Sequence, residues 1–352
     1  MARAIELARR ADYRTSPNPM VGAVVVDREG VVAGEGFHRA RGEPHAEQEA
    51  LAAAGERARG GTIVVNLEPC SHEHRSPPCA DAIIAAGISR AVIAIEDPDP
   101  RVRGAGIARL QAAGVETAIG VDEGLALRLN EFYFWHRHTG RPFVAAKFAM
   151  SLDGRIATAS GESRWITGAA ARSHAHLLRH MHDAILVGVN TVLRDDPELT
   201  ARDAGSDPRQ PIRVVLDSRL RTPAAARVLG ARTIIASGET ASRDGAEVLA
   251  LPLQDGRVAL KPLLDELGRR GVISLLVEGG AETHASFFGQ GLVNKVYAYV
   301  SPKLIGGRNA PGPLGGAGIE RLAEAQSLHD TEILKLEEDF LMTGYLDVHR
   351  DR

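Results

Sequence analysis

The sequence has only two cysteines and few aromatic residues, and these shortages exclude several classes of protein. Two cysteines in 352 residues cannot form a disulfide framework, which points to metal binding or catalysis for their thiols. Aromatic residues make up 4% of the chain, which argues against a stacking platform for single-stranded nucleic acid. The formal net charge is −3 without a basic block, which argues against a broad nucleic-acid-binding patch.

Long apolar runs are missing as well. No run approaches the roughly 18 consecutive apolar residues that a membrane span needs. Residues 1–14 include arginines, Glu6 and Asp12 but no apolar core, which predicts an amphipathic helix of the fold rather than a signal or transit peptide. We therefore expect a cytoplasmic protein with neither a membrane nor a nucleic-acid partner. Hydrophobic residues at 44% and charged residues at 25% indicate a globular chain, and its length predicts about two domains.

Strand and helix patterns alternate along both halves of the chain, which predicts an α/β protein with mainly parallel sheets covered on both faces. In the first half we expect strands at 21–26 and 31–37, joined as a hairpin, and at 62–67, 91–97 and 115–120, with helices at 45–54, 79–87, 103–113 and 122–138. The turn at 139–142 (TGRP) predicts a division into domains 1–141 and 142–352. In the second half we expect strands at 143–150, 184–190, 211–217, 233–237, 272–280 and 293–300, with helices at 168–182, 260–270 and 281–290.

One histidine and two cysteines stand at the ends of these elements in a pattern that suits catalytic zinc. His45 opens a helix, Cys70 follows the strand at 62–67, and Cys79 opens the next helix. Three protein ligands leave the fourth tetrahedral position open to water, whose pKa zinc lowers towards about 7. Glu47 lies two residues from His45, where it can move protons without binding the metal. The pattern follows the H-x-E…P-C-x-x-C signature of zinc nucleobase deaminases, with the second cysteine displaced by a longer insert.

Three other interpretations stay open at this point. The cysteines could be buried structural thiols beside an unrelated histidine. The zinc could be structural, with His72 or His74 as a fourth protein ligand. A deaminase acting on nucleic acid would instead need a basic groove, which this acidic chain with few aromatic residues does not favour.

The first half resembles the deaminase half of the bifunctional riboflavin-biosynthesis deaminase/reductase family. The matching segments are PCSHEHRSPPC (69–79), TSPNPMVGAVVV (15–26) and GEPHAEQEAL (42–51). The resemblance implies a cytidine-deaminase-like α/β/α domain with Zn²⁺ on His45, Cys70 and Cys79 and with Glu47 as proton shuttle. It also implies that Asn18 contacts the pyrimidine and that three residues face the phosphoribosyl end, namely His38, His72 and Arg75. His74 replaces the family's usual glycine and Asp99 its usual asparagine, so a degenerate deaminase half is a further alternative.

The second half has no G-x-G-x-x-G after a strand, so a Rossmann site is not indicated. Its segments AAKFAMSLDGRIA (145–157), GESRWITG (161–168), GVNTVLRDDPELT (188–200) and LLVEGGAETHASFF (276–288) resemble the reductase half of the same family. The resemblance implies a dihydrofolate-reductase-like α/β domain that uses NADPH. It places dinucleotide contacts at Thr167, Thr191, Asp195, Glu278, Gly279 and Gly280, and substrate contacts at Lys147, Ser163, Arg179 and Arg202.

The resemblance implies two consecutive reactions. The first half would remove the 2-amino group of 2,5-diamino-6-ribosylamino-4(3H)-pyrimidinone 5′-phosphate by hydrolysis. The second would reduce the ribosyl side chain to give 5-amino-6-(5-phosphoribitylamino)uracil. The family also implies a homo-oligomer.

Three further expectations concern single side chains of the second half. Lys147 lies in an apolar strand, so we expect it to point into a site and to act in the reaction rather than to extend from a sheet edge into solvent. Trp165 is expected in the core. Among the histidines at 174, 176, 180 and 182, the helical spacing of His176 and His180 permits a metal, but no third ligand is evident, and we expect a partly solvated helix face.

Overall fold

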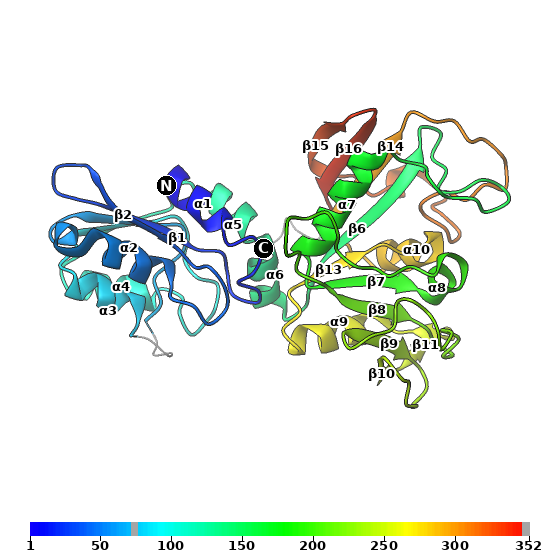
Figure 1. Ribbon diagram of the computed structural model, residues 1–352, viewed down its shortest axis with the longest axis horizontal. Coiled ribbons are helices and arrows are strands. Elements are labelled where there is room, and N and C mark those ends of the chain that lie inside the picture. Colours follow the sequence, from blue (N-terminus) through cyan, green and yellow to red (C-terminus); the bar gives the residue numbers. More distant parts are fainter. Residues whose placement is uncertain (72–76, 347–352) are drawn as a thin grey trace. The chain divides into compact units, whose positions relative to one another are not determined.

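The computed structural model describes residues 1–71 and 77–346 of the chain. Two compact units make up the structure, Met1–Gly140 and Arg141–Arg352, and each is described by itself (Figure 1). Among the described residues, none of the helices has both the length and the apolar character of a membrane span.

The first unit is a sheet with helices on both faces. In its described part, five strands are arranged in the order β2-β1-β3-β4-β5, with bounds β1 Gly22–Val26, β2 Val32–Phe37, β3 Thr62–Val65, β4 Arg90–Ile93 and β5 Glu116–Ile119. The helices α2 (Ala46–Ala54), α3 (Cys79–Ala85) and α4 (Ala105–Ala112) pack on one face through a core that includes Ile63, Ile83 and Leu110. On the other face, α1 (Ala2–Arg9) packs through Leu7 against Val24.

The hairpin of β1 and β2 is confirmed, but the expectation of a mainly parallel sheet is wrong for this unit. β1 pairs antiparallel with both β2 and β3, while β3, β4 and β5 are parallel. The hairpin explains the first of these antiparallel pairings, because a short turn joins only antiparallel strands.

The single helix expected over 122–138 is two helices, α5 (Glu123–Leu129) and α6 (Glu131–Thr139), separated by Asn130. The buried Asn130 side chain accepts a hydrogen bond from Met20 N at 2.8 Å and donates one to Met20 O at 2.9 Å. The interruption of the helix therefore accompanies a link to the segment that leads into β1. The N-terminal helix is shorter than expected, since α1 ends at Arg9.

Replacing Asn130 by Ala is expected to destabilise the first unit by about 1–3 kcal/mol, because the buried Met20 N–H loses its acceptor. Hydrogen exchange of the β1 amides measures the effect. Gln111→Ala removes an exposed amide that bonds Thr117, and it should change the opening free energy by less than about 0.5 kcal/mol. Equal protection in both variants would contradict this role of Asn130.

The second unit contains a larger sheet. Its described part has nine strands in the order β10-β9-β8-β7-β13-β6-β14-β16-β15, parallel as far as β14 and antiparallel from β14 through β16 to β15. The strands that match the expected ones are β6 (Phe143–Ser151), β7 (Ala184–Gly188), β8 (Ile212–Leu216), β9 (Thr233–Ser237), β13 (Ser274–Val277) and β14 (Lys295–Ser301). The helices are α7 (Ala169–Met181), α8 (Val189–Asp195), α9 (Leu260–Arg269) and α10 (Ala281–Gly289).

Several elements of this unit were not predicted. They are α8, the strands β10 (Glu247–Ala250), β15 (His329–Leu336) and β16 (Asp339–Tyr345), and the ribbon of β11 (Leu253–Gln254) with β12 (Arg257–Val258). β15 is exposed along most of its length, so it lacks the alternation of buried and exposed residues that identifies a strand. The expected strand 184–190 ends at Gly188, where α8 begins.

Candidate active sites

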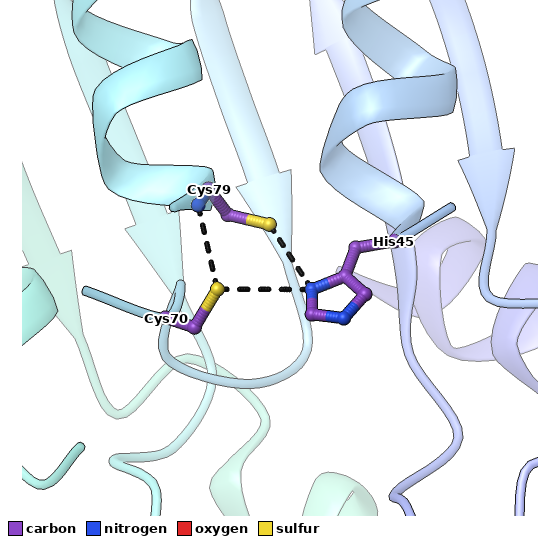
Figure 2. Close-up of side chains that lie close together, drawn as sticks. All are labelled: His45, Cys70 and Cys79. Atoms are coloured by element: carbon purple, nitrogen blue, oxygen red, sulfur yellow. Dashed lines mark hydrogen bonds between the residues drawn. The ribbon is translucent and has the colours of Figure 1, made fainter. Parts of the chain in front are cut away.

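Three helix and strand ends of the first unit bring one histidine and two cysteines together. His45 is the N-cap residue of α2, Cys79 is the first residue of α3, and Cys70 follows β3. Figure 2 shows the three side chains pointing toward one another. His45 Nδ1 lies 3.2 Å from Cys79 Sγ and 3.7 Å from Cys70 Sγ, and all three donor atoms lie within 4.8 Å of one another.

These donors fit a tetrahedral zinc ion. Zinc–nitrogen bonds of about 2.0–2.1 Å and zinc–sulfur bonds of about 2.3 Å set the donor atoms roughly 3.5–3.8 Å apart. The observed separations of 3.2 and 3.7 Å lie close to this range. Among the described residues, this is the one group of three or more His, Cys, Asp or Glu side chains with such geometry.

The hydrogen bonds among the three side chains shift their pKa values in a way that also suits a cation. Hydrogen bonds from Cys79 and His45 lower the pKa of Cys70 to about 4. The Cys70 sulfur in turn raises the pKa of Cys79, with burial adding to the shift, and it raises the pKa of His45. A dication binds the deprotonated forms of all three groups.

Glu47 lies in the first turn of α2 beside this cluster and is 3% exposed. Burial raises its pKa to about 7, although His45 opposes the shift. A carboxyl group with a pKa near neutrality both accepts and returns protons, as a general acid–base residue must.

The expected substrate residues of this unit are placed only in part. His38 is 3% exposed, its ring centroid lies 5.3 Å from that of His45, and its Nε2 atom has no hydrogen-bond partner in the described part of the chain. Burial lowers its pKa. Asn18 is half-buried in the segment before β1, where its N–H donates to Thr15 O at 2.9 Å. His72, His74 and Arg75 lie outside the described residues, and with them the possible fourth zinc ligand.

Asp99 makes local contacts that account for a carboxylate at this position. Arg101 donates to it from its backbone N at 3.0 Å and from Nη2 at 2.6 Å. These hydrogen bonds lower the pKa of Asp99 to about 2.

The second unit contains a cavity of about 560 Å³ beside β6 and α7. Four residues predicted from the sequence line it: Lys147, Thr167, Arg179 and Arg202. Ser163 does not line this cavity, although the neighbouring Arg164 does. Lys147 therefore points into the cavity, as its apolar strand predicted, with Nζ 5.6 Å from the centroid of the Tyr299 ring.

Glu278 follows the last residue of β13 and binds two residues that line the cavity. Its carboxylate accepts hydrogen bonds from Arg179 Nε at 2.8 Å and Nη2 at 2.9 Å, and it lies 3.5 Å from Lys147 Nζ. Burial raises the pKa of Glu278, but the charges of Arg179 and Lys147 outweigh this effect and lower the pKa to about 2. The carboxylate thus contacts residues expected on the substrate side.

This ion cluster predicts a pH-dependent stability of the second unit. Because the pKa of Glu278 falls from 4.5 to about 2 on folding, its contribution is complete above pH 4.5 and is lost as the pH falls towards 2. Glu278→Gln should therefore cost roughly 3 kcal/mol at pH 7, with the difference from the original protein shrinking below pH 4.5. Urea unfolding at several pH values measures it. The surface variant Glu247→Gln should show a smaller loss, and a Glu278→Gln difference that is independent of pH would contradict the assignment.

Three of the expected dinucleotide residues, Thr191, Gly279 and Gly280, lie where α8 and α10 begin, whereas Asp195 is the last residue of α8. Gly279 and Gly280 follow β13, and Gly280 is the N-cap residue of α10. A Cβ atom on Gly279 would lie 2.5 Å from Thr283 Cβ, whereas one on Gly280 would meet only Thr191 Oγ1, at 3.8 Å, among the described atoms. The open space at the start of a helix fits a phosphate group of a dinucleotide. The backbone carbonyl oxygen of Asp195 accepts a hydrogen bond from Arg164 Nη2 at 2.6 Å.

Other side chains of the cavity were missed or misplaced by the sequence analysis. Trp165 is 63% exposed and lines the cavity, so its expected place in the core is wrong. Arg172 also lines the cavity and lies 4.7 Å from the Trp165 ring centroid. The spacing of Arg172, His176 and Arg179 on α7 is the signal that could have found it, because helical residues three and four apart share a face.

The expected partly solvated face fits His174 and His176, which are half-buried, but it is wrong for the other two histidines of the cluster. His180 and His182 are fully buried. His180 Nδ1 accepts a hydrogen bond from Arg209 N at 2.9 Å, and His174 Nδ1 lies 2.7 Å from the Tyr299 hydroxyl. His176 Nδ1 accepts from Arg202 N at 3.2 Å, which joins α7 to the segment that carries Arg202.

Comparisons with known proteins agree with both halves. The family model of the RibD C-terminal domain matches residues 142–342, and that of the cytidine and deoxycytidylate deaminase zinc-binding region matches residues 1–95. The riboflavin biosynthesis protein RibD of Synechocystis is 42% identical over 357 residues, which cover 98% of this chain and 95% of that protein. RibD of Escherichia coli is 42% identical over 349 residues, 95% of either chain.

Solved structures agree as well. RibD of Acinetobacter baumannii (form 1) has a TM-score of 0.90 at 38% identity and covers 98% of this chain and 97% of its own. The diaminohydroxyphosphoribosylaminopyrimidine deaminase/5-amino-6-(5-phosphoribosylamino)uracil reductase of Thermotoga maritima has a TM-score of 0.86 at 35% identity, with the same coverage. The chain therefore belongs to the RibD family, and it is a bifunctional deaminase and reductase of riboflavin biosynthesis that uses zinc and NADPH.

Proposed function

We propose that residues 1–141 deaminate a phosphoribosyl diaminopyrimidine and that residues 142–352 then reduce its ribosyl side chain. The observation that carries the proposal is the convergence of the donor atoms of His45, Cys70 and Cys79 beside the buried Glu47. Lys147, which lines the cavity of the second unit, lies in a different compact unit, so each reaction has its own set of residues.

In the first reaction, His45, Cys70 and Cys79 hold the zinc. When bound, zinc supplies a Lewis acid that makes a water molecule acidic enough to lose a proton near neutral pH. Glu47 takes that proton as water attacks the carbon bearing the 2-amino group and delivers it to the ring nitrogen. It then carries the second proton of the water from the new hydroxyl group to the amino group, which leaves as ammonia. His38 would face the substrate with Nε2, which has no hydrogen-bond partner among the described residues, and Asn18, His72 and Arg75 are the other proposed contacts.

In the second reaction, Lys147 donates a proton to the sugar ring oxygen as the ring opens. NADPH supplies the hydride, with Thr167, Thr191, Asp195, Gly279 and Gly280 as its proposed contacts. Glu278 supports the orientation of Lys147 and Arg179 through the ion pairs described above.

Arg179, Arg202 and Ser163 are the proposed substrate contacts on this side. Arginine suits a sugar phosphate because of its positive charge and its several N–H donors, although Nε and Nη2 of Arg179 already bind Glu278.

Chelation of the metal tests the assignment of the halves. Protein treated with a zinc chelator should release no ammonia from the diaminopyrimidine phosphate, and zinc should restore the release. The same metal-free protein should oxidise NADPH at an unchanged rate when it is given the deaminated product. Loss of both activities on chelation would contradict separate sites.

We propose further that the enzyme acts in the cytoplasm as a homo-oligomer. A reducing compartment keeps the two free cysteines available as metal ligands, which supports the first point. Sedimentation analysis of the purified protein tests the second, and a monomer at all concentrations would contradict it.

A further inference from the structure

Glu68 lies two residues before Cys70. Unlike a surface carboxylate, its side chain is surrounded by backbone N–H groups. It is 3% exposed. One oxygen accepts hydrogen bonds from Gly106 N at 2.9 Å and Ile107 N at 3.2 Å. The other accepts from Asp97 N at 3.2 Å and Gly104 N at 2.9 Å. A single buried carboxylate thus binds four backbone N–H groups.

Three of these N–H groups belong to the beginning of α4. The N-cap residue of this helix is Gly104, which has no side chain to accept them. Glu68 therefore caps α4 from another part of the chain, and the negative charge suits the positive end of the helix dipole. The contact joins the end of β3 to α4 and to the loop after β4.

The packing between α4 and the zinc-ligand segment leaves no space. A Cβ atom on Gly106 would lie 1.9 Å from the carbonyl oxygen of Pro69, the residue between Glu68 and Cys70. On its other side, Cys70 is bound to the start of α3, where Ala80 N donates to Cys70 O at 3.1 Å and Cys79 N donates to Cys70 Sγ at 3.4 Å. Cys70 is thus held between the first turns of two helices.

We propose that Glu68 is a positioning residue of the zinc site, which fixes the direction of the Cys70 thiolate by binding the start of α4. The inference rests on the proposed role of Cys70 as a zinc ligand. Glu68 is not itself a zinc ligand, and it would act on the metal through the position of Cys70. Residues that orient a ligand in this indirect way typically change metal affinity by about 10- to 100-fold when they are replaced.

Cobalt substitution of the full-length protein tests the proposal. Co²⁺ in the original protein should give thiolate-to-cobalt and ligand-field absorption bands, and Glu68→Gln should shift them and weaken zinc binding by about 10- to 100-fold. The amide keeps the size of the side chain but places an NH₂ group against N–H donors. Glu96→Gln, an exposed carboxylate of the same unit, is the matched control and should change neither quantity.

A purely structural role would lower the stability of the first unit without altering the cobalt spectrum or zinc affinity of the folded protein. If Glu68→Gln does not fold, Glu68→Asp keeps the carboxylate on a shorter side chain and disturbs the same contact more mildly, and a shifted spectrum in it supports the proposal. Unchanged spectra and affinities in every folded variant would overturn it. Absence of thiolate-to-cobalt bands in the original protein would instead overturn the zinc assignment itself.

Discussion

Glu47→Gln is expected to reduce ammonia release by roughly 10²- to 10⁴-fold while the bound zinc stays in place. The amide is nearly the same size as the carboxyl group but cannot accept and return a proton. Zinc should remain because its donors are the side chains of His45, Cys70 and Cys79, which the substitution does not touch. Ammonia release and zinc content, measured on the same preparation, test the expectation.

Glu49→Gln is the matched control for this substitution. Glu49 lies on the same helix α2, but its carboxylate pairs with Arg39 at 3.0 Å instead of facing the metal ligands. We expect its ammonia release to stay within about threefold of the original, because the substitution leaves Glu47 and the zinc donors His45, Cys70 and Cys79 in place. Full deaminase activity in Glu47→Gln, or loss of zinc from it, would contradict the role of Glu47.

Lys147→Met is expected to reduce NADPH oxidation by roughly 10²-fold or more, because the sugar ring oxygen loses its proton donor. Methionine keeps much of the length of the side chain and fills the same space in the cavity wall. The substitution also leaves the hydrogen bonds between Arg179 and Glu278 in place. Turnover with the deaminated substrate at saturating NADPH measures the effect.

The control for Lys147 is Lys261→Met, which removes an exposed lysine on α9. It should reduce the substrate at the original rate. NADPH binding, followed by the fluorescence of the nucleotide, should persist in Lys147→Met, since the substitution leaves the proposed contacts Thr191, Gly279 and Gly280 at the starts of α8 and α10 in place. Unchanged turnover in Lys147→Met would exclude Lys147 as the proton donor.

The zinc cluster could be predicted from the sequence because its residues stand at ends of regular elements. His45, Cys70 and Cys79 each lie at a strand or helix end, and parallel strands bring such ends to one edge of a sheet. Lys147 was predictable for a similar reason, since a lysine in an apolar strand must face a polar cavity or solvent.

Other features depend on contacts between distant segments and leave no local signal. Asn130 interrupts a helical pattern to bind Met20, which is 110 residues earlier in the chain. Glu278 looked like part of a glycine turn, yet its carboxylate contacts Arg179, 99 residues away. Trp165 has the large apolar side chain typical of a core residue. It is exposed in the cavity wall because of the path of the segment between β6 and α7.

The central claim is that two separate sites, one in each half, act in succession on one substrate. Mixing the variants Glu47→Gln and Lys147→Met tests it most directly, with the diaminopyrimidine phosphate and NADPH supplied together. The account predicts that neither variant alone forms the ribitylamino product at more than a small fraction of the original rate, and that the mixture forms it because each supplies the step that the other lacks. An inactive mixture, or one variant that completes both steps alone, would contradict the account.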